Sequence, residues 1–147
     1  MKKLFELTVC QNDDIEMGQT CSGEILVSPT GDGAFSGELL QGKVVPAGMG
    51  TTCTPAPGIN DIDTVMLLQA DDGAYILMEL KAIFDTDEAV EARLMKGEVV
   101  DPDEYYYKGV VSFRTGSDKY RWLERKVCVC TGIIENWEKP VFEIYML

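Results

Sequence analysis

Short apolar runs separated by clusters of Gly, Asp, Asn and Pro divide this chain along its whole length. Such a pattern is typical of β-meanders and barrels, in which each run forms a strand and each cluster forms a turn. It predicts a mainly β fold, an antiparallel β-barrel of about eight strands around one core. The expected strands are Phe5–Cys10, Ser22–Ser28, Ala34–Val45, Thr64–Ala70, Ala74–Phe84, Tyr105–Arg114, Lys126–Ile134 and Val141–Leu147.

The connections between these runs carry different signals. Asp71–Gly73 and Thr30–Gly33 contain residues that tolerate positive φ, so each predicts a hairpin turn between two strands. A further turn is expected near Asn136. The stretch Ala47–Asn60 is rich in Gly, Pro and Thr and has no period, so we expect a long loop at the mouth of the barrel.

Two segments depart from the strand pattern and predict one or two short helices. Asp85–Gly97 begins with acidic residues, continues with helix-forming residues and ends in Lys-Gly, which is the pattern of a short helix. Ser117–Glu124 starts on a good N-cap residue and places Tyr120 and Leu123 three positions apart. One or two helical turns are therefore expected to pack against the barrel there.

Length and charge limit the class of protein. The 147 residues, 46% of them hydrophobic, fit one domain that spans residues 1–147. The net charge of −12 repels phosphate backbones and anionic lipid, so neither nucleic acid nor a membrane is expected as a partner. Glu6 interrupts the first apolar stretch, and no run approaches the roughly 18 apolar residues of a membrane span. The expected location is cytoplasmic.

The reactive side chains exclude several chemistries. The chain has no histidine, which excludes Ser/His/Asp and Cys/His catalysis. It has no phosphate-binding glycine loop, dinucleotide fingerprint or calcium loop, so no cofactor is expected. Cys128 and Cys130 share one face of a strand and fit either core thiols or ligands of a soft metal. Because free cysteine is commonly buried and histidine ligands are missing, core thiols are favoured and no metal is expected.

Strand alternation selects the candidate site residues, because residues two apart share one face of a strand. Tyr106 and Lys108 share a face, as do Glu79 and Lys81 in another strand. Glu143 and Tyr145 form a third such pair. The polar face of these three strands therefore consists of Tyr106, Lys108, Glu79, Lys81, Glu143 and Tyr145. If this face points inward, it lines a pocket; if it points outward, it is solvated surface, which is the commoner case. At least one ring of the run Tyr105–Tyr107 is expected in the core.

A set of residues in a fixed order resembles one known family over nearly the whole chain. These residues are Gly33-x-Phe35-x-Gly37, Gly42, Pro46, Asp72-Gly73-Ala74, Tyr106, Phe113-x-Thr115-Gly116, Tyr120-x-Trp122-Leu123 and Phe142-Glu143-Ile144-Tyr145. On them, the chain is similar to the uncharacterised protein family 0311, also called domain of unknown function 3237.

This resemblance implies a calycin-like or cyclase-like β-barrel with a central cavity, and no established activity. It also implies differences at five positions. Relatives typically carry Asp-Trp where this chain has Gly50-Thr51 and Arg where it has Val65. They tend to have Arg at the position of Lys108 and Asn at that of Glu124. An Asp and an Arg that face a cavity would be a natural catalytic or anion-binding pair, and this chain lacks both.

Three hypotheses for function follow. The first is small-molecule binding in a barrel cavity lined by Tyr106, Lys108, Tyr145 and Glu79. The second is an isomerase, cyclase or lyase in which Tyr106 donates a proton and Glu79 or Glu143 accepts one, which requires a carboxylate within hydrogen-bond reach of the phenol. The third is a homo-oligomer without catalysis that assembles through an exposed apolar strand face.

Overall fold

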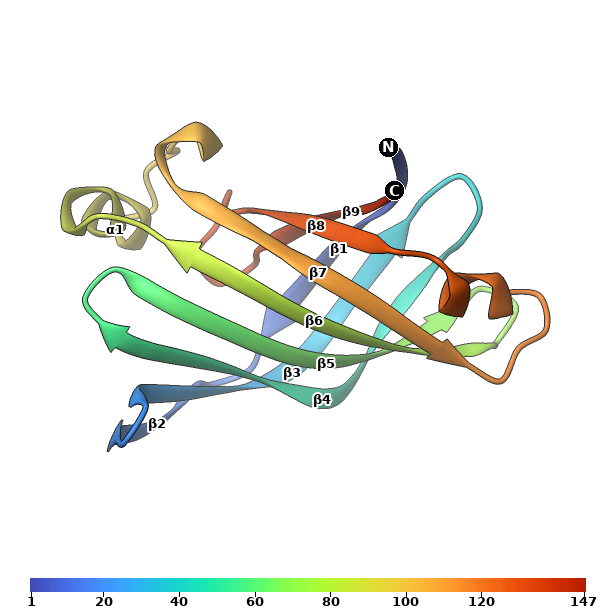
Figure 1. Cartoon of the computed structure of the whole chain (residues 1–147), viewed down its shortest axis with the longest axis horizontal. Coiled ribbons are helices and arrows are strands. Elements are labelled where there is room, and N and C mark those ends of the chain that lie inside the picture. The colour runs from blue at the N-terminus through green and yellow to red at the C-terminus, as the bar shows by residue number, and fades with distance from the viewer.

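The computed structural model describes residues 1–147 and contains a closed, antiparallel β-barrel (Figure 1). Its strands are β1 (Lys2–Gln11), β2 (Ile15–Thr20), β3 (Gly23–Ser36), β4 (Gln41–Ala56), β5 (Ile59–Ala70), β6 (Tyr75–Asp85), β7 (Tyr106–Thr115), β8 (Cys128–Ile133) and β9 (Val141–Met146). The hydrogen-bonded order is β1-β9-β8-β7-β6-β5-β4-β3, and β1 pairs with β3 to close the ring of eight. The predicted eight-stranded barrel is confirmed. The ninth strand, β2, which the sequence did not predict, pairs only with β3.

Alternation of side chains gives the barrel an inner and an outer face. In β6, Ile76, Met78, Leu80, Ala82 and Phe84 are buried, and the residues between them are partly or fully exposed. Because successive side chains of a strand point to opposite faces, one apolar face per strand is enough to build the core. That core is one continuous cluster of 29 buried residues.

Aromatic rings fill one end of the barrel. The ring of Phe5 lies 5.2 Å from that of Phe35 and 6.0 Å from that of Phe113, measured between centroids. The 3₁₀ helix η2 (Arg121–Arg125) contributes the buried Leu123 to the same core. The helical turns predicted within Ser117–Glu124 are confirmed, and they help to close this end of the barrel.

The α-helix α1 (Glu88–Met95) lies between β6 and β7 at the opposite end from η2 (Figure 1). Asp87 caps it by accepting a hydrogen bond from the backbone N–H of Val90, and Val90 and Leu94 are buried. A second 3₁₀ helix, η1 (Pro102–Glu104), follows before β7. The helix predicted within Asp85–Gly97 is confirmed. None of the helices is both long and apolar enough to cross a lipid bilayer.

The prediction for Thr30–Gly33 was wrong, because β3 runs through this segment without turning. The pairing of β3 with β4 shifts register between Pro29 and Gly33, so the segment forms a bulge that bends the strand. The actual turn lies at residues 37–40, inside the predicted strand Ala34–Val45. Gly37 is required there, since a Cβ would lie within 1.9 Å of the carbonyl oxygen of Leu4.

The long loop expected at Ala47–Asn60 was also wrong. β4 continues to Ala56 and β5 begins at Ile59, so the two strands form a hairpin with Pro57-Gly58 between them. Gly58 has φ +80°, which fits the position after Pro in a type II turn. The Pro-Gly pair was therefore the informative signal, and the surrounding Thr residues have a high β propensity. The hairpins at Asp71–Gly73 and near Asn136 are confirmed by turn hydrogen bonds.

Candidate functional site

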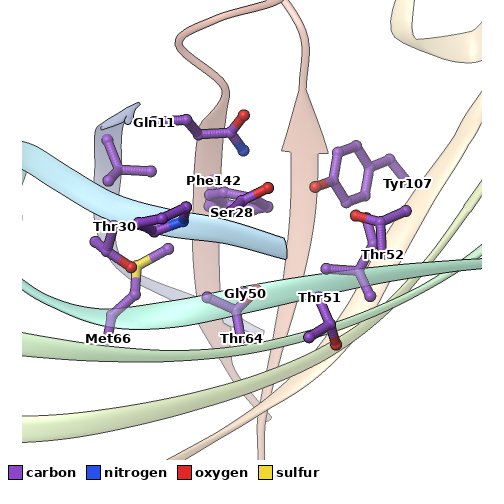
Figure 2. Close-up of a pocket in the computed structure, with 13 residues that line it drawn as sticks. Gln11, Ser28, Thr30, Gly50, Thr51, Thr52, Thr64, Met66, Tyr107 and Phe142 are labelled. Carbon is purple, nitrogen blue, oxygen red and sulfur yellow. The ribbon is translucent and has the colours of Figure 1, made fainter. Parts of the chain in front are cut away.

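The interior of the barrel is not completely filled. At the end opposite the Phe5 cluster, a cavity of about 50 Å³ remains, which we call the hollow (Figure 2). Its lining comes from β1, β3, β4, β5, β7 and β9: Val9, Gln11, Ser28, Pro29, Thr30, Gly50, Thr51, Thr52, Ile62, Thr64, Met66, Tyr107 and Phe142. A cavity of this size holds a few water molecules, or one end group of a larger ligand.

Bulges in the strands open the hollow. β3 bends at Pro29–Gly33, and the pairing of β4 with β5 shifts register between Val45 and Gly48. Gly48 has φ +117°, and a Cβ there would lie 2.3 Å from the carbonyl oxygen of Val65. Only glycine fits this backbone position without strain. The bend leaves Thr30 buried at the wall of the hollow.

Tyr107 is a polar side chain of the hollow whose ring is packed on several sides. Its ring stacks on Phe84, with centroids 4.8 Å apart and planes at 26°. The edge-on ring of Phe142 lies 5.5 Å away. A Cβ on Gly132 would lie only 2.5 Å from the Cγ and Cδ2 atoms of Tyr107, so the ring rests directly on a glycine of β8. Three neighbours therefore fix the direction of its hydroxyl.

That hydroxyl points into the hollow, as Figure 2 shows, and has no hydrogen-bond partner in the protein. The phenol of Tyr105, by contrast, accepts a hydrogen bond of 2.9 Å from the backbone N–H of Ile134. Burial raises the pKa of Tyr107 well above the usual 10.0. The group is thus protonated near neutral pH and free to donate to a molecule in the hollow.

The lining is polar but carries no charge. Ser28, Thr30, Thr52 and Thr64 add hydroxyl groups, and Gln11 adds an amide. No carboxylate, lysine or arginine takes part. Because burying an unpaired ion is costly, this surface suits hydrogen bonding to neutral oxygen-bearing groups.

The residues predicted to line a cavity lie elsewhere. Tyr106 and Lys108 are exposed on the outer face of β7, and Glu79 and Tyr145 are partly exposed on the outer faces of β6 and β9. Of the two orientations left open by the sequence, the structure shows the outward one, because the apolar alternate positions of these strands take the inner face. The expectation that the Tyr105–Tyr107 run reaches the core is confirmed, since Tyr105 and Tyr107 are both buried.

The predicted acid–base pair is not assembled. Tyr106 pairs with Asp85 across β6 and β7, and Glu79 lies six positions further along β6, which is about 20 Å at the rise of a strand. Glu143 accepts a hydrogen bond from Tyr145 instead of from Tyr106. This bond raises the pKa of Tyr145. Neither Glu79 nor Glu143 therefore pairs with the phenol that was proposed as the acid.

The cysteines divide into two groups. Cys128 and Cys130 are buried members of the core cluster, which confirms core thiols for this pair. Desolvation raises the pKa of Cys130 to about 11, so its thiolate is scarce near neutral pH. Cys10 and Cys21 are exposed, and Cys53 is partly exposed.

Comparison with known proteins decides the family. The sequence model described as "Protein of unknown function (DUF3237)" matches residues 1–147. The chain belongs to the DUF3237 family. A UPF0311 protein from Clostridium acetobutylicum is 32% identical over 131 residues, which are 88% of this chain and 82% of that protein. The resemblance seen in the sequence is thereby confirmed.

Solved structures of similar proteins share the barrel. A β-barrel-like protein from Acinetobacter baumannii superposes with a TM-score of 0.85 at 30% identity, covering 99% of this chain and 93% of that one. A conserved protein of unknown function from Rhodopseudomonas palustris superposes with a TM-score of 0.89 at 25% identity, covering 99% and 95%. These similarities establish the fold and leave the activity of DUF3237 proteins open.

The sequence resemblance implies that DUF3237 relatives carry different residues at Gly50 and Val65. One of these positions lies inside the barrel and the other outside. Gly50, where the resemblance implies Asp, is buried and lines the hollow. Val65, where it implies Arg, is 41% exposed on the outer face of β5. In this chain, therefore, the hollow has no charge at Gly50, and an Arg at Val65 would not lie on the inner face.

Proposed function

We propose that this protein binds a small, electrically neutral molecule whose hydroxyl or carbonyl group enters the hollow. The observation that carries the proposal is the inward hydroxyl of Tyr107, which is rigidly positioned and has no partner in the protein. No buried side-chain nitrogen or oxygen lacks a partner, so this hydroxyl is open to the hollow, where it can bond water or a ligand group that replaces the water.

Neutrality follows from the lining. The hollow offers hydroxyl and amide groups beside the apolar side chains of Ile62, Met66 and Phe142. A carboxylate or ammonium group there would lose its hydration without gaining an opposite charge. The chain's net charge of −12 further disfavours anions on approach.

Three compounds of similar size but different charge test whether the ligand must be neutral: benzyl alcohol, benzoate and benzylamine. We expect benzyl alcohol to shift the backbone amide NMR signals of Ser28, Thr30 and Thr52, and the two charged analogues to leave them unchanged at the same concentration. Native mass spectrometry of protein purified gently from its own cells would show whether a natural ligand remains bound.

Adjacent tyrosines supply a matched pair of variants. Tyr107→Phe removes the hydroxyl in the hollow, and we expect benzyl alcohol affinity to fall by roughly three- to tenfold, the worth of one hydrogen bond. Tyr106→Phe removes an exposed hydroxyl on the outer face and should leave the affinity unchanged. Equal effects of the two variants, or equal binding of benzoate, would contradict the proposal.

A further inference from the structure

The outer face of β5, β6 and β7 carries exposed apolar side chains among its charged ones. Ile83 is 47% exposed and Val110 is 58% exposed, on neighbouring strands. A shallow outer groove of about 830 Å³ runs over β5–β9, and Ile83, Val110, Val129 and Tyr145 contribute to its lining. Contiguous apolar surface of this kind commonly marks an interaction site.

Strand register places one charged residue on each side of Ile83. Asp61 of β5 pairs with Ile83 of β6, and Ile83 pairs in turn with Lys108 of β7. Neighbouring strands lie about 4.8 Å apart, so the acid and the base flank the apolar side chain at roughly equal distances. All three side chains are exposed on the outer face.

The charges of this row have no partner within the chain. Asp63 and Lys81, one step further along the same strands, bond each other at 3.9 Å. Asp61 and Lys108 form no ion pair. An acid, an apolar residue and a base thus stand in line with both charges available to an incoming surface.

The row Asp61–Ile83–Lys108 is complementary in charge to a second copy of itself that is related by a two-fold rotation. An isologous interface brings the same patch of two copies together, so each contact occurs twice. A two-fold axis that lies in the interface, parallel to β6 and through Ile83, exchanges the places of β5 and β7. Asp61 of each copy then meets Lys108 of the other, and the two Ile83 side chains pack together.

We propose that two copies of this chain associate through this face, with Ile83 at the centre and two reciprocal Asp61–Lys108 ion pairs beside it. The same rotation lays β5 and β4 of the second copy over β7 and β8, where the outer groove lies. Face-to-face packing of two sheets is a standard β arrangement. The interface lies outside the barrel and leaves the hollow unaffected.

Charge reversal tests the pairing. Sedimentation velocity should give the wild-type protein twice the mass of the 16.3 kDa chain. Asp61→Lys opposes two lysines, and Lys108→Asp opposes two aspartates, so each variant alone should raise the dimer Kd at least about tenfold. An equimolar mixture of the two variants restores an acid–base pair at both contacts and should form a heterodimer. The doubly reversed chain should dimerise again.

The apolar centre has its own pair of variants. Ile83→Lys should abolish the dimer, whereas Val99→Lys, at a position 87% exposed in the connection after α1, should leave it intact. Rescue by mixing also shows that the singly reversed chains are folded. A monomeric wild-type protein at millimolar concentration would overturn the proposal. So would a dimer indifferent to charge reversal, or reversed variants that stay monomeric when mixed.

Discussion

The contact between Gly132 and the ring of Tyr107 predicts a large cost for a single methyl group. In Gly132→Ala, the new Cβ would lie 2.5 Å from two ring carbons of Tyr107 and 2.8 Å from a third. Carbon atoms pack comfortably at about 3.5–4.0 Å, so the ring or the strand must move by about 1 Å. Phe84 and Phe142 already hold the ring, which limits its movement.

Overpacking of a well-filled core costs about 1–3 kcal/mol. For a domain of this size, each kcal/mol corresponds to about 2–4 °C in Tm, so a central value near 2 kcal/mol predicts a fall of roughly 4–8 °C. Reversible urea unfolding followed by tryptophan fluorescence, together with calorimetry, measures both quantities.

The chain offers a matched control and a test of mechanism. Gly116 has no atom within 4 Å of an added Cβ, so Gly116→Ala should change the free energy of unfolding by no more than about 0.5 kcal/mol. In a Tyr107→Leu background the clash with the ring is absent, and the cost of Gly132→Ala should shrink. A Gly132→Ala protein as stable as wild type, or an undiminished cost in the Leu background, would refute this reasoning.

Three further results are expected. Gly48→Ala should lower the free energy of unfolding in urea by at least about 1 kcal/mol, because φ is +117° and a Cβ would meet a carbonyl oxygen at 2.3 Å. Because the pKa of Tyr107 is higher in the folded than in the unfolded protein, its contribution to stability is complete below the unfolded value near 10.0 and is lost as pH rises above it. The free energy of unfolding in urea should therefore fall above about pH 10, and it should fall less steeply in Tyr107→Phe. Ellman's reagent at pH 8 should label exposed Cys10 within the folded state and should label Cys130, whose pKa is about 11, only after unfolding.

The barrel was predictable because its main signal is local. In β6, alternating apolar residues define one buried face, and Asp71–Gly73 marks the turn before it. The predictions were wrong in segments whose residue types fit two different local structures. Glycine and aspartate at Thr30–Gly33 fit a turn, yet they also fit a bulge, and the choice depends on the partner strand.

The candidate site was missed for a related reason. Alternation correctly grouped Tyr106 with Lys108 on one face, but periodicity alone does not say which face is inside. The binding hypothesis used the inward alternative for the polar residues, whereas burial followed the apolar face. Tyr107 could have been found by asking which tyrosine shares a face with Val111 and Phe113, both of which are buried.

The same alternation makes the two proposals separable by experiment. Tyr107 and Lys108 are neighbours in β7, but one side chain points into the hollow and the other lies on the outer face. If both proposals hold, Tyr107→Phe weakens ligand binding and leaves the dimer unchanged, while Lys108→Asp breaks the dimer and leaves ligand binding unchanged. If Lys108→Asp also weakened binding of benzyl alcohol, the hollow and the interface would be energetically coupled. Because β7 is the shared element, its hydrogen exchange in each variant would then locate the coupling.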